Sequence, residues 1–241
     1  MPELVTASPM SDTIAEPAPM TLAVIGSGTP FRVRRIYCVG RNYLDHIREM
    51  KEADERDPPF FFQKPTDAIV PDGATVPYPS ATKDLQFEVE LVAAIGREGC
   101  DISIDEAEAH IFGYAIGIDL TRRDLQREAA KRGLPWEMGK SFDHSAPCGP
   151  IHRIASTGAI RKGAISLSVN GTARQNSDIA CMIWNVREVI ANLSRQYELR
   201  KGDLIFTGTP AGVGPVVPGD RLECAITGLG TLHIRIGPTK G

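Results

Sequence analysis

The sequence lacks the features that would place it in several special classes. Its five cysteines are odd in number, far apart and without a C-x-x-C pair, which argues against a disulfide framework or a zinc site. No apolar run approaches the roughly 20 residues of a membrane-spanning helix, and no charged-then-apolar leader opens the chain. A net charge of -3 leaves no positive excess for nucleic acid or an anionic membrane. We therefore expect a soluble, cytoplasmic protein with reduced cysteines that binds neither.

What is present is enough apolar sequence for a sizeable core. With 241 residues, 42% of them apolar, the chain fits one domain, or one domain with an arm. Residues 1–20 carry four prolines among Ser, Thr, Glu and Ala, a composition that cannot bury enough surface to order itself. We expect a flexible arm over residues 1–20 and a single domain over residues 21–241.

The segment from Leu85 to Leu91 alternates apolar and polar residues, as a strand with one apolar face does. Glu88 and Glu90 then point to the same side, about 7 Å apart along the backbone. Carboxylates that close raise each other's pKa unless a positive group lies between them, and a hard divalent cation prefers oxygen ligands. The alternative is that both glutamates form the solvent-exposed face of an edge strand, and the spacing alone favours this alternative.

A second acidic candidate follows the nearly uncharged run of residues 111–118, which is of strand type. Asp119 ends this run, and a buried carboxylate without a partner is costly. A metal ion shared with Glu88 and Glu90 would supply a partner, and so would Arg123.

A short helix is expected from about Tyr43, with Asn42 as its N-cap. In this helix, His46 and Glu49 are three residues apart and share a face. A carboxylate beside an imidazole fixes its tautomer and keeps it basic, which is how a water-activating pair is built. An ordinary solvated pair is the alternative, and the pair alone favours it. The charged segment 51–57 is interpreted as a loosely placed lid.

Residues 121–124 read T-R-R-D, a pattern that favours a helix start, and Gly133 is expected to end that helix. Arg123 and Gln126 would share one face of it. They are able to bind a substrate carboxylate and carbonyl, although such pairs are more often surface residues only.

Two lysines, Lys140 and Lys64, each have a surface interpretation and an interpretation as a cation inside a polar site. Lys140, flanked by glycine and bulky residues, is either a partly enclosed lysine that stabilises an enolate oxygen near a metal or a paired surface lysine. Lys64 ends the aromatic run of residues 60–62 and is interpreted as a surface lysine in preference to a cation in a polar cavity.

The second half of the chain is expected to contain strands and hairpins, with Asn170-Gly171 as the strongest hairpin signal. One longer helix is predicted over residues 179–196, its apolar stripe serving only to pack the core. The glycine-rich segment 202–214 lacks the lysine and spacing of a Walker A motif, which excludes nucleotide binding there. Its backbone amides and the Thr209 hydroxyl are able to bind a carboxylate.

Seven patterns, in this order, together resemble the fumarylacetoacetate hydrolase family over roughly residues 20 to 237. They are G-R-N-Y-x-x-H-x-x-E (Gly40 to Glu49), K-P (Lys64, Pro65), F-E-V-E-L (Phe87 to Leu91), G-x-D-x-T-x-R-D-x-Q (Gly117 to Gln126), P-W-x-x-x-K-x-F-D (Pro135 to Asp143), V-N-G (Val169 to Gly171) and G-D-L-I-F-T-G-T-P-x-G-V-G (Gly202 to Gly214).

The resemblance implies an α+β, mostly β fold, a mixed β-sandwich roll with a short lid helix, and a homodimer. It implies Mg²⁺ or Mn²⁺ on Glu88, Glu90 and Asp119, a water-activating pair of His46 and Glu49, and a catalytic Lys140. It places five residues in the substrate-binding shell: Arg41, Lys64, Arg123, Gln126 and Thr209.

Within the family, the chain looks most similar to members that hydrolyse the carbon-carbon bond of an acylpyruvate, such as fumarylpyruvate in gentisate-type aromatic catabolism. The substrate would be a small 2,4-dioxo acid, and fumarate and pyruvate would be the products. Two alternatives on the same site are decarboxylation of a 2-oxo acid such as oxaloacetate and isomerisation of a 2-hydroxy-dienedioate. A metal- or carboxylate-binding protein without activity is a third.

Overall fold

The structure is a computed structural model that describes residues 18–50 and 57–239. Nearly all of the expected arm over residues 1–20, and the segment 51–56 of the expected lid, lie outside this range. Among the described residues no helix is both long enough and apolar enough to cross a membrane. The helices are α1 (Leu44–Met50), α2 (Arg123–Lys131), α3 (Glu137–Lys140), α4 (Ile154–Thr157) and α5 (Val186–Ser194), with 3₁₀ turns at Thr66–Ala68, Ala107–His110 and Ile179–Cys181.

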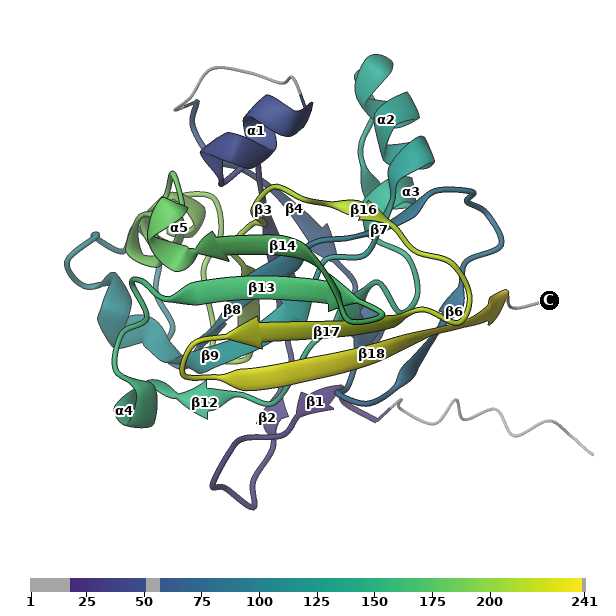
Figure 1. Cartoon of the computed structure of the whole chain (residues 1–241). Helices are drawn as coiled ribbons and strands as arrows, with labels where there is room; N and C mark the ends of the chain where they lie inside the picture. The colour runs from purple at the N-terminus through teal and green to yellow at the C-terminus, as the bar shows by residue number, and fades with distance from the viewer. Residues whose placement is uncertain (1–17, 51–56, 240–241) are drawn as a thin grey trace, which may run out of the picture.

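Two large sheets form the layers of the molecule (Figure 1). The five-stranded sheet has the order β14-β13-β17-β18-β6 and consists of β6 (Thr75–Tyr78), β13 (Ala164–Val169), β14 (Thr172–Asp178), β17 (Arg221–Ile226) and β18 (Gly230–Thr239). The six-stranded sheet has the order β12-β9-β8-β15-β3-β4 and consists of β3 (Arg35–Gly40), β4 (Phe60–Lys64), β8 (Val89–Ile95), β9 (Ile111–Ile118), β12 (His152–Arg153) and β15 (Asp203–Phe206).

Smaller sheets complete the fold. A three-stranded one joins β7 (Leu85–Phe87), β10 (Thr121–Arg122) and β16 (Gly214–Pro215), and two pairs join β1 (Thr21–Leu22) with β2 (Phe31–Arg32) and β5 (Ile69–Val70) with β11 (Ala146–Pro147). Parallel pairs, such as β15 with β3, occur beside antiparallel ones, so the fold is mixed as expected. The predicted hairpin joins β13 to β14, with Asn170 and Gly171 at φ of 52° and 78°, as a type I′ turn requires.

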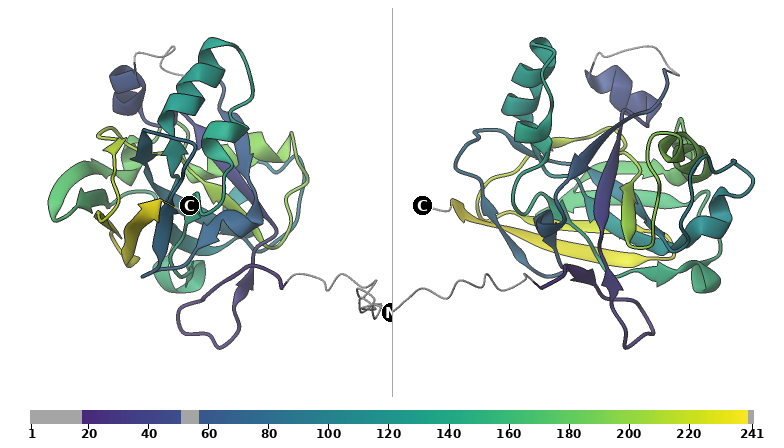
Figure 2. Two further views of the ribbon diagram at one scale, coloured as in Figure 1. Left: turned by 90° about the vertical axis from the view of Figure 1, so that its right-hand side faces the viewer. Right: turned by 180° about the vertical axis from the view of Figure 1, so that it is seen from behind.

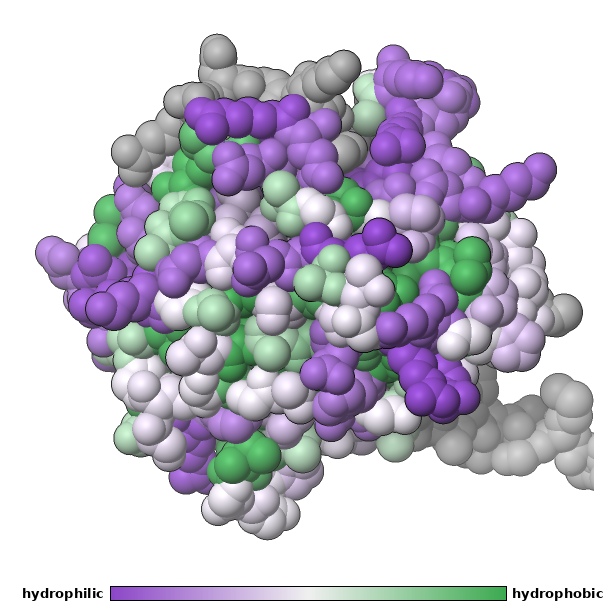
Figure 3. All heavy atoms as spheres, viewed as in Figure 1, coloured by the Kyte–Doolittle hydropathy of each residue, from purple (hydrophilic) through white to green (hydrophobic). Residues whose placement is uncertain are grey.

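The main core lies between the two large sheets. Alternate residues of the five-stranded sheet, among them Leu167 and Leu232, pack in one apolar cluster with Leu91 of β8 and Tyr114 of β9. On the other face of this sheet, small and weakly polar residues alternate with charged ones, as Figure 3 shows. That face meets solvent in the described part of the chain, whereas the six-stranded sheet is covered on both faces.

Strand β8 is central and fully buried. A second apolar cluster, which contains Val92 of β8 and Phe31 of β2, covers the other face of the six-stranded sheet. The alternative that Glu88 and Glu90 form the exposed face of an edge strand, which the spacing alone favoured, is excluded because β8 has β9 on one side and β15 on the other. An alternating pattern does not distinguish a polar face in water from a polar face in a buried site.

The six-stranded sheet curls into a roll. Lys64 on edge strand β4 is four strands from β9 in the sheet order, yet its ammonium lies 2.8 Å from the carboxylate of Asp119, just after β9. Helices α1, α2 and α3 gather at one end of the sandwich, and β1 and β2 lie at the other, as the front and back views show (Figures 1 and 2). The loops at the helix-covered end are where the candidate site forms.

The single helix predicted over residues 179–196 is wrong. The structure has a 3₁₀ turn and then α5, which begins after Asn185. Asn185 and Glu188 form a capping box, in which each side chain accepts a hydrogen bond from the other residue's backbone N–H. This cap fixes a helix start inside the predicted range.

The capping box provides a test of the fold. Asn185→Ala is expected to lower the free energy of unfolding by about 1 kcal/mol, because two backbone N–H groups lose their acceptor. Urea denaturation measures this, with the exposed Asn176→Ala as the control, expected to change it by less than about 0.5 kcal/mol. Equal losses in both variants would show that the cap contributes nothing specific.

Candidate functional site

Strand register brings three carboxylates together. In the antiparallel pair β8–β9, Val89 lies opposite Ile118, and the backbone N–H of Asp119 donates to the carbonyl of Glu88 at 2.8 Å. Glu90 lies two residues beyond Glu88 on the same face. One ligand atom from each of Glu88, Glu90 and Asp119 lies within 4.8 Å of the others, and all three residues are buried. Within residues 18–50 and 57–239, no other group of three acidic, histidine or cysteine residues comes as close.

Three buried cations surround this acidic triad. The ammonium of Lys140 donates to Glu88 Oε2, Asp119 Oδ2 and Thr121 Oγ1, each at 2.7 Å. Arg123 donates to the other oxygen of Glu88. Lys64 Nζ lies 2.8 Å from Asp119 Oδ1 and is buried, so the prediction of a surface lysine is wrong.

The cations act unequally on the three carboxylates. Burial acts to raise the pKa of Glu88, but Lys140 and Arg123 outweigh it and hold that pKa well below its ordinary value. Burial, together with Asp119 and Glu88, raises the pKa of Glu90 well above its ordinary value. Burial acts to lower the pKa of Lys140, but the carboxylates of Asp119 and Glu88 raise it overall. Among the described residues, Glu90 is thus the carboxylate of the triad that forms no ion pair with a lysine or arginine.

The donor set fits a hard divalent cation. Three carboxylates offer only oxygen, as Mg²⁺ and Mn²⁺ prefer, and oxygens within 4.8 Å of one another need little inward movement to share one ion. Asp119 Oδ1 is paired only with the ammonium of Lys64 among the described residues, and that ammonium also donates to the carbonyls of Leu120 and Lys140. Each carboxylate has about four lone-pair positions, so the existing hydrogen bonds leave room for a metal.

His46 and Glu49 lie on one face of α1, as predicted, with His46 Nδ1 3.4 Å from Glu49 Oε2. The same Glu49 oxygen accepts the backbone N–H of Gly212 at 3.1 Å, which ties α1 to the glycine-rich loop. A carboxylate beside Nδ1 favours the proton on that nitrogen and leaves Nε2 as the basic one. Asn42 does not cap the helix with its side chain, because its amide oxygen accepts the N–H of Trp184.

The glycine-rich loop supports the triad from the side of β15. Gly208 donates its backbone N–H to Glu90 Oε2 at 2.7 Å, with Gly208 at a φ of +93° that favours glycine. The hydroxyl of Thr209 donates to the carbonyl of Val89 and accepts from Gln175, both at 2.8 Å. Its hydroxyl hydrogen is thus committed to the protein, and Thr209 contributes to the site mainly by holding the loop in place.

Gln175 was not identified from the sequence. Its side chain is fully buried and joins three backbone or hydroxyl groups, accepting from the N–H of Val89 and donating to Thr209 and to the carbonyl of Pro210. It therefore links β14 of one sheet to the start of β8 in the other. A lone glutamine in a polar strand carries no local signal for this role.

Arg123 and Gln126 share a face of α2, as predicted, and are both buried. Arg123 donates through Nε to Gln86 and through Nη1 to Gln126, each at 2.9 Å. Gln126 lines the same pocket as the triad. The sequence predicted a helix start at Thr121, but Thr121 does not cap this helix. It pairs with Gln86 in the sheet as part of β10, and its hydroxyl accepts a hydrogen bond from Lys140.

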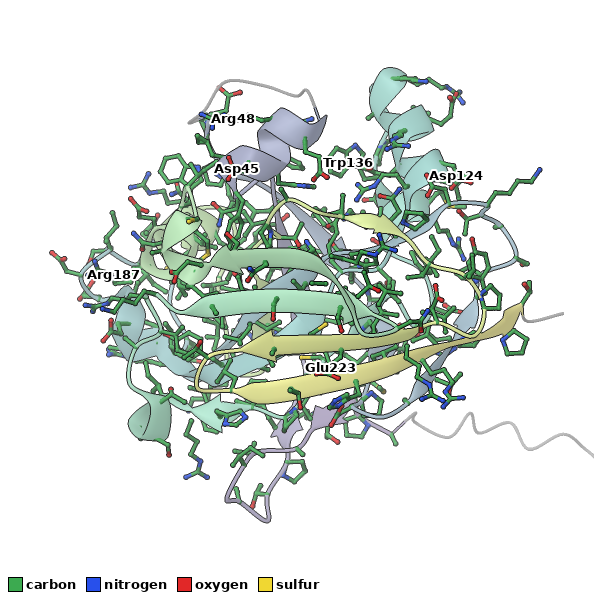
Figure 4. The ribbon with its side chains drawn as sticks, viewed as in Figure 1. Asp45, Arg48, Asp124, Trp136, Arg187 and Glu223 are labelled. Atoms are coloured by element: carbon green, nitrogen blue, oxygen red, sulfur yellow. The ribbon has the colours of Figure 1, made fainter. Side chains whose placement is uncertain are left out.

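A narrow pocket leads to the triad. It is lined by Glu88, Glu90, Asp119 and Lys140 at its buried end, and by His46, Arg123, Gln126 and Thr209 beside them; Val39, Gly40, Arg41, Phe62 and Trp136 complete it. Trp136 lies between α1 and α2 (Figure 4). The free volume of the pocket is about 30 Å³, which is room for one or two waters. Substrate entry therefore requires the side chains that line the pocket to move apart. Larger hollows of 590 and 760 Å³ lie elsewhere, but neither includes a residue of the triad.

Comparisons with known proteins agree with this site. The family model described as fumarylacetoacetate (FAA) hydrolase C-terminal matches residues 35–237. A fumarylpyruvate hydrolase from Ralstonia sp is 45% identical over 181 residues, which are 75% of this chain and 94% of that protein. A mitochondrial oxaloacetate tautomerase from Mus musculus is 38% identical, over 84% of this chain and 91% of that protein.

A solved structure resembles the whole molecule. The crystal structure of fumarylpyruvate hydrolase from Pseudomonas aeruginosa in complex with Mn²⁺ and pyruvate is 52% identical, with a TM-score of 0.92, and the match covers 95% of this chain and 100% of that one. The matched segment of the family model includes every residue of the pocket described above. The chain therefore belongs to the fumarylacetoacetate hydrolase family.

Proposed function

We propose that this protein is a metal-dependent hydrolase that cleaves the carbon-carbon bond of an acylpyruvate, with fumarylpyruvate as its substrate and fumarate and pyruvate as products. One observation carries the proposal: the acidic triad and the His46–Glu49 pair line the same narrow pocket. The similarity to two fumarylpyruvate hydrolases, at 45% and 52% identity, supports this substrate over other acids of the family.

Glu88, Glu90 and Asp119 would hold Mg²⁺ or Mn²⁺. When bound, the cation supplies Lewis acidity toward the carboxylate and 2-oxo group of the substrate. The Pseudomonas relative was crystallised with Mn²⁺, which favours Mn²⁺ as the first ion to test, with Mg²⁺ beside it.

His46 would activate water. Its side chain is nearly buried at the pocket, and Glu49 holds the Nδ1 side of the ring. The basic Nε2 takes a proton from water while the water oxygen attacks the acyl carbonyl carbon. Glu49, tied to the glycine-rich loop through Gly212, keeps the ring in this orientation.

The bond between the acyl carbon and the methylene group then breaks. Its electron pair stays on the pyruvate fragment as an enolate, and a proton equivalent to the one taken by His46 returns to the methylene carbon. Lys140, a buried ammonium beside Glu88 and Asp119, places positive charge where the enolate oxygen develops. Arg123 and Gln126 would orient the 2-oxo acid end of the substrate through their remaining hydrogen-bond donors.

The pH dependence of the reaction follows from the burial of His46. Burial lowers the pKa of His46 below its ordinary 6.5, although the carboxylates of Glu88 and Glu49 act to raise it. The imidazole accepts a proton only when neutral, so we expect kcat/KM to stay high as the pH falls through 6.5 and to decline only below it. Glu49→Gln removes one raising contribution and should move this decline to still lower pH. A profile of kcat/KM against pH that declines above 6.5 would contradict this assignment.

An assay of substrates tests the proposed function directly. The metal-loaded protein is supplied with fumarylpyruvate and acetylpyruvate, and pyruvate release is followed for each. With oxaloacetate, the ultraviolet absorbance of its enol form is followed as well as pyruvate release, because tautomerisation changes the first and only decarboxylation gives the second. We expect fumarylpyruvate to be hydrolysed fastest. The 38% identity to an oxaloacetate tautomerase makes tautomerisation of oxaloacetate the second candidate, and faster turnover of oxaloacetate than of either acylpyruvate would favour it.

The setting of the reaction is also proposed. Hydrolysis of fumarylpyruvate would serve gentisate-type aromatic catabolism in the cytoplasm, as the resemblance to such hydrolases implies. A homodimer, also implied by that resemblance, would be seen by light scattering as a particle of twice the 26.1 kDa chain mass.

A further inference from the structure

Arg41 has a backbone conformation that few residues other than glycine adopt. It follows Gly40, the last residue of β3, and its φ is 59°, in the left-handed region. Gly40 lies opposite Phe60 in β4, and a Cβ added to Gly40 would lie 2.0 Å from Cζ of the Phe60 ring. The ring thus packs directly on the backbone before Arg41, and the chain turns sharply there into α1.

The guanidinium of Arg41 lies beside two aromatic rings. Its Cζ is 5.5 Å from the centroid of Phe60 and 6.0 Å from that of Trp136, and these two rings meet edge to face at 5.0 Å. Both distances are within the range of cation–π attraction. Arg41 and Trp136 are only half-buried, whereas the acidic triad is almost fully buried, so they stand at the mouth of the pocket.

Three cations line this pocket, and two of them lie at its buried end. Lys140 donates to Glu88 and Asp119 of the triad, and Arg123 donates to Glu88. Lys64 is buried and does not line the pocket. Arg41 is the half-buried one of the three, so its position is the one that suits a second negative charge on the substrate outside the triad.

We propose that Arg41 binds the terminal carboxylate of a dicarboxylic acylpyruvate and makes the enzyme selective for an ionised acyl chain over a neutral one. The proposal rests on the proposed function. If the acyl carbonyl lies beside His46 for attack by water, the rest of the acyl chain must continue away from the triad, toward the mouth. There the planar guanidinium offers two parallel donors to a carboxylate, and Trp136 offers an apolar ring to the carbon chain.

The test compares two substrates on two variants. Arg41→Met removes the charge and keeps a long side chain, and Arg41→Lys keeps the charge but not the paired donors. We expect Arg41→Met to lower kcat/KM for fumarylpyruvate roughly 100-fold, mainly through KM, and for acetylpyruvate less than about 3-fold. Arg41→Lys should give a loss of roughly 10-fold on fumarylpyruvate alone. If Arg41→Met does not fold, as circular dichroism would show, Arg41→Lys decides the question.

Arg48→Met is the matched control, because Arg48 lies on α1 near the same end of the molecule, with 62% of its side chain exposed (Figure 4). It removes the same charge, and we expect less than about a 3-fold change on either substrate. Equal losses on both substrates in a folded Arg41 variant, or no loss on fumarylpyruvate, would overturn the proposal. A wild-type protein that cleaves neither substrate would instead refute the proposed function, and with it the role of Arg41.

Discussion

Replacing His46 by alanine is expected to lower kcat on fumarylpyruvate by about 10³-fold, because general base catalysis by a positioned imidazole contributes 10²- to 10⁴-fold. The triad, its three cations and the strand pairing do not depend on this side chain, so the variant should keep its metal affinity and its thermal stability. Steady-state kinetics, with Mn²⁺ binding followed by calorimetry, measures both expectations.

The control for this variant is Asp45→Asn. Asp45 precedes His46 on α1, and its side chain is 80% exposed and pairs with Arg48 at 3.4 Å (Figure 4). It should change kcat less than about 2-fold. Glu49→Gln keeps the size of Glu49 but removes the charge that holds the His46 ring. We expect it to lower kcat by more than Asp45→Asn and by less than His46→Ala. Full turnover by His46→Ala would end the assignment of a water-activating pair.

Replacing Glu90 by glutamine is expected to abolish tight metal binding, since one of three anionic ligands is lost. At micromolar metal concentrations, kcat/KM should therefore fall at least about 10³-fold. Glu90 is the most informative ligand to replace. It accepts only the N–H of Gly208 among the contacts found in the described residues, and a glutamine oxygen can still accept it. Replacing Asp119 or Glu88 would instead remove a carboxylate that pairs with buried lysine or arginine cations.

Calorimetric titration with Mn²⁺ measures this effect, and a chelator should reduce the wild-type protein to the same low activity. The exposed Glu223→Gln on β17 removes the same charge far from the triad and should leave both quantities unchanged (Figure 4). Wild-type activity that survives chelation would exclude a metal-dependent reaction.

The local parts of this site were predictable from the sequence. The three-residue spacing of His46 and Glu49, and of Arg123 and Gln126, places each pair on one helix face whatever the rest of the fold does. The two-residue spacing of Glu88 and Glu90 likewise fixes a shared face. The spacing did not decide whether that face met water or a buried site. The resemblance of seven sequence patterns to the family indicated the buried metal site.

The long-range parts were not predictable in the same way. Asp119 meets Glu88 because of the register of β8 and β9, and Lys64 reaches Asp119 because the sheet curls. Neither relation leaves a local pattern, and the same holds for Gln175. The misplaced helix start is different, since the N-x-x-E pattern of Asn185 and Glu188 was present in the sequence and marks the true start of α5.

The most direct test of the central claim is the anomalous X-ray scattering of Mn²⁺ in crystals of the protein. The claim is that one divalent cation is shared by carboxylates from β8 and the end of β9, in the pocket that also holds the imidazole of α1. A single strong anomalous peak in contact with Glu88, Glu90 and Asp119 is the predicted result. A peak elsewhere, with Glu88 and Asp119 still bound to Lys140, Lys64 and Arg123 and with Glu90 bound to Gly208, would contradict the account.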